Sequence, residues 1–185
     1  MRMNQNDEIS AHEIVNFYPK EKLEKIFKDY AELSNAKFLA QKICDYRAKK
    51  KINSAKELSE IIGNKKYFNR KISTAILAFQ AIRIEVNNEL FELKNLLDKI
   101  ENSKIKNAKI AIITFHSLED KIVKSYFKKW ASDCICPPNS IQCECGKNNS
   151  IGKIITKKPI TPSKEEIEKN PRSSCAKLRI FEINR

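Results

Sequence analysis

Glycine and long apolar runs are both scarce in this chain of 185 residues. The three glycines, Gly63, Gly146 and Gly152, stand far apart, and none lies in a G-x-G-x-x-G or P-loop arrangement. These residues therefore do not contain the glycine-rich turn of a nucleotide-binding half-sheet. No run approaches the roughly 18 apolar residues of a membrane span, and the N-terminus has no apolar signal core. We expect a cytoplasmic protein with no membrane association.

Basic residues dominate the charge balance. Lys and Arg total 36 against 23 Asp and Glu, which gives a formal net charge of +13 and an isoelectric point near 9.5. This surplus favours a polyanionic partner such as RNA, although a solvated, Lys-rich surface has the same composition. With 41% hydrophobic residues, the chain is long enough for one ordinary core or for two small ones.

Helical periodicity extends through the first half of the chain. Residues 1–19 are polar, have no sustained period, and predict a linker. From residue 20 onward, apolar side chains recur at helical spacing and predict short amphipathic helices; the first stripe is Leu23, Ile26, Phe27 and Tyr30.

Two further signals bound the later helices. Ser54 and Glu57 form a predicted capping box, and Gly63 ends the helix that follows it. Residues 72–100 keep helical spacing with no internal Gly or Pro, so they predict one long helix.

An apolar, β-branched run of strand length lies at residues 109–115 and ends in polar residues. This pattern is typical of a strand buried on both faces of an α/β sheet. Ser117 with Asp120 predicts the cap of a helix behind the strand. Because ligands bind just past the carboxyl ends of strands in open α/β sheets, we expect Phe115, His116 and Ser117 on the rim of a site.

Two residues, His116 and Arg83, have both a functional and a structural interpretation. His116 is the candidate catalytic residue, since an imidazole after a strand is placed for general base catalysis; otherwise it bonds to backbone and shapes the pocket wall. Arg83 lies one turn before Asn87, and both are candidate substrate-binding residues. The Arg83 guanidinium either clamps a phosphate or pairs with Glu85, Glu89 or Glu119.

A basic cluster with interleaved aromatics lies among the predicted helices. Lys50, Lys66 and Arg70 are its candidate RNA-binding residues, in a longer set of Arg47, Lys49, Lys50, Lys51, Lys65, Lys66, Tyr67, Phe68, Arg70 and Lys71. Cations that neutralise phosphates beside rings that stack on bases are what an RNA surface requires. A solvated face with the two aromatics in the core fits the pattern equally well.

Four cysteines gather in one loop, residues 134–145: Cys134, Cys136, Cys143 and Cys145. Two Cys-x-Cys pairs can close a tetrahedral thiolate site, for which zinc is the natural metal. A cytosolic chain rarely forms disulfides, and free thiols or another metal are the alternatives. A closed four-Cys site has no open position, so its role would be structural.

The last segment predicts a short strand from residue 153, a brief helix over residues 164–169 capped by Ser163, and a final strand over residues 176–183. We expect the final strand to lie antiparallel beside residues 109–115. The basic residues of this segment add to the basic surface: Lys157, Lys158, Arg172, Lys177 and Arg179.

Several separated motifs resemble the MraW family. They are Phe115-His116-Ser117-Leu118-Glu119-Asp120, the preceding Phe79-Gln80-Ala81-Ile82-Arg83-Ile84-Glu85-Val86-Asn87-Asn88-Glu89-Leu90, and the later Asn170-Pro171-Arg172 and Ala176-Lys177-Leu178-Arg179. Met1-Arg2-Met3-Asn4 is also similar to an internal Met-Arg-Met-Asp motif of that family. The resemblance runs nearly end to end but covers only the later part of the family pattern.

The resemblance implies S-adenosylmethionine-dependent methylation of N4 of a cytosine in the decoding region of 16S ribosomal RNA. The implied fold is α/β: the C-terminal part of a class I, Rossmann-like methyltransferase sheet with an inserted all-helical module. Residues 1–19 would then be a linker, 20–103 a helical RNA-recognition module, and 104–185 the C-terminal part of the sheet. The implied partner is the small ribosomal subunit.

By the same resemblance, the cofactor-binding residues belong before Met1, on this polypeptide or on a second chain, and this chain alone is expected to be inactive. Two departures from the family remove basic side chains: the segment 73–78 lacks the Arg of the family's His-Pro-Ala-Thr-Arg-Thr run, and Ser174 replaces a second Arg. The alternative function is a non-catalytic, basic RNA-binding protein stapled by zinc.

Overall fold

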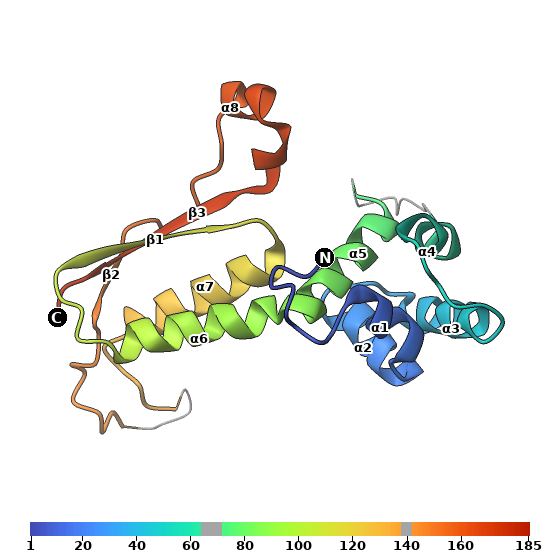
Figure 1. Cartoon of the computed structure of the whole chain (residues 1–185). Helices are drawn as coiled ribbons and strands as arrows, with labels where there is room; N and C mark the ends of the chain where they lie inside the picture. The colour runs from blue at the N-terminus through green and yellow to red at the C-terminus, as the bar shows by residue number, and fades with distance from the viewer. Residues whose placement is uncertain (64–71, 138–141) are drawn as a thin grey trace. The chain divides into compact units, whose positions relative to one another are not determined.

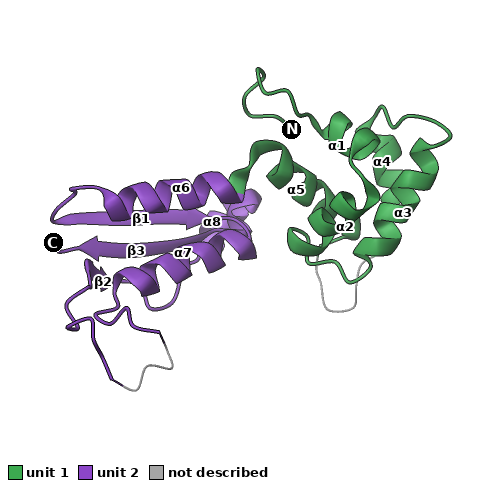
Figure 2. Cartoon of the chain, turned by 90° about the horizontal axis from the view of Figure 1, so that it is seen from below, with its two compact units in different colours: residues 1–89 green, residues 90–185 purple. Residues whose placement is uncertain are grey.

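The computed structural model describes residues 1–63, 72–137 and 142–185. These residues form eight α-helices, one short 3₁₀ helix and a three-stranded antiparallel sheet, so the fold is mixed α/β (Figure 1). They divide into two compact units, Met1–Glu89 and Leu90–Arg185 (Figure 2). The first unit thus ends at Glu89, earlier than the boundary expected near residue 103.

The first unit is all-helical. Its helices are α1 (Ala11–Phe17), α2 (Lys20–Asp29), α3 (Ala36–Arg47), α4 (Ala55–Ile62) and α5 (Thr74–Asn87). Every one of them contributes to a single cluster of buried apolar side chains, which includes Ile14, Leu23, Phe27, Leu39, Ile43, Leu58 and Ile82. The apolar stripes that predict these helices therefore form the core of the unit.

The predicted capping box of α4 is confirmed only in its Ser54 half, because the Glu57 carboxylate accepts from the Asn53 N–H at 2.9 Å instead of from the Ser54 N–H. The Ser54 hydroxyl accepts a hydrogen bond from the Glu57 N–H at 3.1 Å, and α4 ends just before Gly63. Gly63 has a φ of 78°, a left-handed conformation that glycine adopts without a steric penalty.

Helix α1 lies within the segment predicted to be a linker, so that prediction is wrong for residues 11–17. The Ser10 hydroxyl accepts from the Glu13 N–H at 3.4 Å, and the Glu13 carboxylate accepts from the Ser10 N–H at 2.9 Å. Ile14 and Val15 are buried in the core. Two helical turns hold too few apolar residues for a visible period, which is why the sequence pattern does not reveal them.

The predicted long helix over residues 72–100 is also wrong. Asn88 has a φ of 50° and separates α5 from α6 (Glu89–Asn102). Asn adopts the left-handed conformation more readily than other non-glycine residues, so it can end a helix without Gly or Pro. The apolar spacing continues on both sides and hides the break.

The second unit combines a sheet with two long helices. After α6 come β1 (Ala108–Thr114), α7 (Ser117–Trp130), β2 (Gly152–Ile154), α8 (Lys164–Lys169), the 3₁₀ helix (Pro171–Cys175) and β3 (Lys177–Ile183). The strand order is β1-β3-β2, with both pairs antiparallel, as expected for the first and last strands. Within the described residues β1 pairs with β3 alone, so β1 is an edge strand here.

Helices α6 and α7 cover one face of this sheet (Figure 1). Phe127 and Trp130 of α7 contact Phe181 of β3 with ring centroids 5.3 and 5.4 Å apart. Leu97 of α6 completes this buried cluster with Val123 and Ile183. The aromatic contacts fix α7 on the sheet, and thereby fix the turn that joins β1 to α7.

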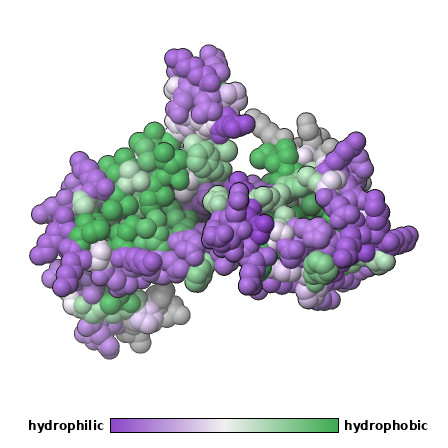
Figure 3. All heavy atoms as spheres, viewed as in Figure 1, coloured by the Kyte–Doolittle hydropathy of each residue, from purple (hydrophilic) through white to green (hydrophobic). Residues whose placement is uncertain are grey.

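The opposite face of the sheet is apolar and open. The alternation along β1 turns Ile110 and Ile112 toward the helices but leaves Ile113 59% exposed. Ile155 and Ile160 are exposed by 45% and 50%, and apolar side chains gather over the sheet in Figure 3. The prediction that this strand is buried on both faces is therefore wrong for the described residues.

Candidate functional site

The turn between β1 and α7 is closed by His116 and Glu119, one residue earlier than the predicted Ser117 and Asp120 cap. The His116 Nδ1 accepts from the Glu119 N–H at 3.4 Å. The Glu119 carboxylate accepts from the N–H groups of Phe115 and His116 at 2.8 and 3.2 Å. An imidazole nitrogen thus takes the place of the Ser hydroxyl in a capping box, and Ser117 becomes the first residue of the helix.

His116 and Glu119 form a mostly buried pair. The His116 side chain is only 7% exposed, and its Nε2 lies 3.3 Å from a Glu119 carboxylate oxygen. Burial raises the pKa of Glu119, but the His116 imidazole and the Phe115 N–H outweigh this effect and leave the pKa below its usual value. The Glu119 N–H orients His116 through Nδ1, whereas the buried Nε2 has no hydrogen-bond partner among the described residues; the general base role of His116 stays a prediction.

The three residues predicted for the rim differ in exposure. Phe115 is 52% exposed and Ser117 is also exposed, whereas His116 is turned inward. An exposed aromatic ring at the carboxyl end of a strand can stack on an unpaired base, and a neighbouring hydroxyl can bond to it. The surface part of this candidate rim therefore consists of Phe115 and Ser117.

A buried ion pair beneath the rim is not predicted by the sequence analysis. Arg179 of β3 donates two hydrogen bonds to Asp120 of α7, at 2.6 and 3.1 Å. The Arg179 guanidinium lowers the pKa of Asp120, and Lys177 at 3.7 Å adds to this effect. Arg179 is only 6% exposed, so the expectation that it adds to the basic surface is wrong.

A simple signal locates Arg179. On a strand, residues two apart share a face, so Arg179 lies on the same face as Phe181 and Ile183. Both of those residues are fully buried. A lone cation in register with apolar residues indicates a buried pair rather than a solvated charge.

Arg83 makes a bidentate ion pair within the first unit. Its Nε lies 2.8 Å from one Glu89 carboxylate oxygen, and its second nitrogen lies 3.1 Å from the other. Glu89 is one of the three partners that the structural interpretation of Arg83 names. The guanidinium is therefore already engaged, and a phosphate would have to compete with Glu89.

Asn87 binds the N-terminal segment. Its side-chain amide donates to the Met1 carbonyl at 3.0 Å and to the Arg83 carbonyl at 2.8 Å, and its oxygen accepts from the Met3 N–H at 2.8 Å. These bonds bring together two of the motifs that carry the family resemblance. No spacing in the sequence predicts this contact.

The structure places only part of the predicted basic cluster. Arg47 donates to the Val15 and Tyr18 carbonyls at 2.9 and 2.6 Å, and Lys50 lies 3.1 Å from Glu57. Lys66 and Arg70 lie outside the described residues, with Lys65, Tyr67, Phe68 and Lys71. Two cations of the cluster thus make internal contacts, which leaves the RNA-binding interpretation a prediction.

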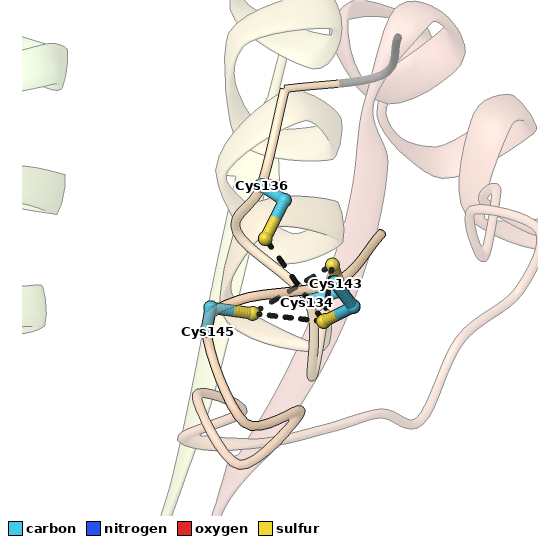
Figure 4. A group of neighbouring side chains, drawn as sticks. All are labelled: Cys134, Cys136, Cys143 and Cys145. Atoms are coloured by element: carbon cyan, nitrogen blue, oxygen red, sulfur yellow. Dashed lines mark hydrogen bonds between the residues drawn. The ribbon is translucent and has the colours of Figure 1, made fainter. Parts of the chain in front are cut away.

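The four loop cysteines come together. Their sulfur atoms all lie within 4.8 Å of one another (Figure 4). The separations are 3.5 Å for Cys143–Cys145, 3.7 Å for Cys134–Cys143 and for Cys134–Cys145, and 3.9 Å for Cys136–Cys143. Such a set of thiols can hold one metal ion.

The thiols of this cluster differ in acidity. The backbone N–H groups of Lys147 and Ile135 lower the pKa of Cys145 to about 6, because they stabilise its thiolate. The hydrogen bond with Cys145 raises the pKa of Cys143 to about 11. At neutral pH the cluster therefore already contains a thiolate, which is the form that binds metals.

Comparison with known proteins assigns the class. The sequence pattern described as the MraW methylase family matches residues 1–184, so the chain belongs to that family, as predicted. No helix among the described residues is both long and apolar enough to cross a membrane.

Curated relatives are similar over the whole chain. Proteins named ribosomal RNA small subunit methyltransferase H from Campylobacter hominis and Campylobacter fetus are each 64% identical over 185 residues. The protein of the same name from Campylobacter jejuni is 62% identical over 184 residues. The chain spans 60% of the length of the first two and 59% of the third.

Proposed function

We propose that this chain supplies the C-terminal part of an S-adenosylmethionine-dependent enzyme that methylates N4 of a cytosine in the decoding region of 16S ribosomal RNA. The observation that carries the proposal is the family match over residues 1–184, together with the name that the relatives bear. The complete protein would act in the cytoplasm on the small ribosomal subunit. In that protein β1 would be an inner strand of a Rossmann-like sheet.

The described residues do not fit the methyl donor by themselves. The N–H groups of Phe115 and His116, at the turn after β1, are taken by Glu119 and are not free to bind an anionic group of the donor. No glycine-rich turn follows β1, since the nearest glycine in the chain is Gly146. We therefore assign cofactor binding to the part of the relatives that this chain does not span.

What this chain contributes is substrate positioning. Methyl transfer to an exocyclic amine requires the nitrogen lone pair in line with the donor, so orientation matters more than base catalysis. Phe115 offers an exposed ring for stacking, and Ser117 offers a hydroxyl beside it. His116 and Glu119 hold the turn that presents both residues. The helical unit would contribute phosphate contacts through Lys50, Lys66 and Arg70, and Arg83 and Asn87 would join them only by exchanging Glu89 and the N-terminal segment for RNA.

The test compares this chain alone with the same chain joined behind the remaining part of the Campylobacter hominis relative. Transfer of a tritiated methyl group from S-adenosylmethionine to unmethylated small-subunit RNA is measured. We expect transfer only by the joined protein, and no binding of the donor to the chain alone in calorimetry. Donor binding by the chain alone would contradict the assignment of the cofactor site.

A matched pair of variants tests the role of the rim. In the joined protein, Phe115→Ala should lower the rate by about tenfold, as expected for loss of one base-stacking contact. Phe38→Ala removes a ring that is 66% exposed on α3 and should leave the rate unchanged. A joined protein that retains the RNA but transfers no methyl group would favour the non-catalytic RNA-binding alternative.

A further inference from the structure

We infer that the four loop cysteines bind one structural zinc ion. They lie in the connection between α7 and β2, away from the turn that presents Phe115. Four thiolates around zinc at a Zn–S distance of about 2.3 Å form a tetrahedron with sulfur atoms about 3.8 Å apart. Four of the six sulfur separations, at 3.5–3.9 Å, agree with this figure, and the two between Cys136 and Cys134 or Cys145 lie within 4.8 Å.

The sulfur geometry separates zinc from a disulfide arrangement. A disulfide joins two sulfur atoms at about 2.05 Å and leaves the pair without a third close sulfur. Here Cys143 has three sulfur neighbours within 3.9 Å, and Cys134 has two. Four sulfur atoms that lie close to one another, with none at bonding distance, are what a single tetrahedral metal ion requires.

The surrounding backbone supports a ligand at this position. The Ile135 N–H points to the Cys145 sulfur at 3.4 Å, a bond that stabilises a metal-bound thiolate. The Asn149 amide donates to the Cys145 and Asp133 carbonyls at 3.2 and 3.0 Å. These contacts hold both ends of the loop in place independently of the metal.

The zinc site would fix the start of β2. The Ile151 N–H bonds to the Trp130 carbonyl at 2.9 Å, so the loop leaves and returns at the end of α7. Trp130 is buried in the core of the second unit. By closing the loop, the metal keeps β2 beside β3 and covers this end of the core. All four positions of the ion are filled by protein, so the site is structural and not catalytic.

The binding step involves no change of oxidation state. Four Zn–S bonds form as the ion loses its bound waters, and each cysteine that is still a thiol releases its proton to the buffer. Binding should therefore tighten as the pH rises through the range where the thiols ionise.

The first test measures metal in the purified, full 185-residue chain. Elemental analysis should give about one zinc per chain. Replacing zinc by Co²⁺ should give the intense visible absorption of a tetrahedral thiolate site, a readout that needs no variant. A chain without bound metal, or one containing iron with inorganic sulfide, would overturn the inference.

The second test uses matched cysteine variants. The double variant Cys143→Ser with Cys145→Ser should lose the zinc. Cys175→Ser changes an exposed cysteine outside the cluster and should retain it. If the double variant fails to fold, alkylation of the unaltered chain tests the site instead. The four loop thiols should react slowly until a chelator is added, whereas Cys175 should react at once. Equal reactivity of all five without a chelator would contradict the site. None of these measurements depends on methyl transfer.

Discussion

The two units differ in how completely they bury their apolar residues. The helical unit, Met1–Glu89, closes one core in which Ile14, Leu23, Phe27 and Ile82 are fully buried. The sheet unit, Leu90–Arg185, buries the face of its sheet toward α6 and α7 but leaves Ile113 59% exposed on the other. A helix satisfies its own backbone, whereas an edge strand leaves a row of N–H and C=O groups unpaired and an uncovered apolar face stays in water. This difference is what the proposed function requires, in which the sheet unit is one part of a larger sheet.

The largest expected effect is on the helix-to-sheet contact of the second unit. Asp120→Asn leaves the Arg179 guanidinium buried without a counter-charge and should lower the free energy of unfolding by about 3–5 kcal/mol. Urea denaturation measures the loss. Glu182→Gln, which removes a pair with the 64% exposed side chain of Lys153, is the control and should cost less than about 1 kcal/mol. Equal losses would mean that the buried pair does not hold α7 on the sheet.

A pair of isoleucine substitutions compares the two units directly. Ile82→Ala, in the closed helical core, should cost about 2–5 kcal/mol. Ile113→Ala, on the open face of the sheet, should cost less than about 1 kcal/mol in this chain. The Ile113 side chain is already mostly exposed to water, so its removal takes away little buried apolar area. After fusion to the remaining part of the relative, the cost of Ile113→Ala should rise. A cost that stays low in the joined protein would show that this face remains open.

Gly152→Ala tests how tightly β2 lies against β3. An added Cβ would stand 2.0 Å from the Glu182 carbonyl oxygen, so the strands must separate locally. We expect a loss of about 1–3 kcal/mol, confined to the sheet unit. Hydrogen exchange should report faster exchange in residues 152–154 and no change in α2 or α3. Unchanged exchange at β2 would contradict the close approach.

The smallest effect concerns acid stability in the helical unit. The Tyr46 hydroxyl, the Asn53 N–H and Lys50 lower the pKa of Glu57 from 4.5 to about 2. Between these pH values the unfolded chain binds more protons than the folded chain, so stability falls as the pH is lowered. Glu57→Gln should make the urea midpoint less dependent on pH in that window. Glu60→Gln, on the exposed side of α4, is the control and should leave the pH dependence of the urea midpoint unchanged. A loss of this pH dependence in Glu60→Gln but not in Glu57→Gln would contradict the assignment to Glu57.

Local sequence signals predict much of this fold, and tertiary contacts account for the rest. The Ser54 cap, the α4 end at Gly63 and the antiparallel final strand follow from capping and alternation. The Asn88 break does not, because a left-handed Asn leaves the apolar period of α5 and α6 intact. The two turns of α1 are too short to show a period.

The candidate site divides in the same way. Position after a strand predicts the exposure of Phe115, and Cys spacing predicts the sulfur cluster. The Arg179–Asp120 pair and the bonds from Asn87 to Met1 and Met3 join distant segments, whereas Arg83 pairs with Glu89, a partner that the sequence analysis already names. The charge of a residue does not distinguish a buried cation from a solvated one. The burial of Arg179 can be predicted only from the alternation of side chains along its strand, which places it on the same face as Phe181 and Ile183.

Amide hydrogen exchange along β1 tests the central claim most directly. The chain alone is compared with the chain joined to the remaining part of the Campylobacter hominis relative. An incomplete sheet predicts that the β1 amides that do not bond to β3 exchange quickly in the chain alone and become protected in the joined protein, while the helical unit is unchanged. Equal exchange along β1 in both proteins would show that no strand is added there, and would contradict the account.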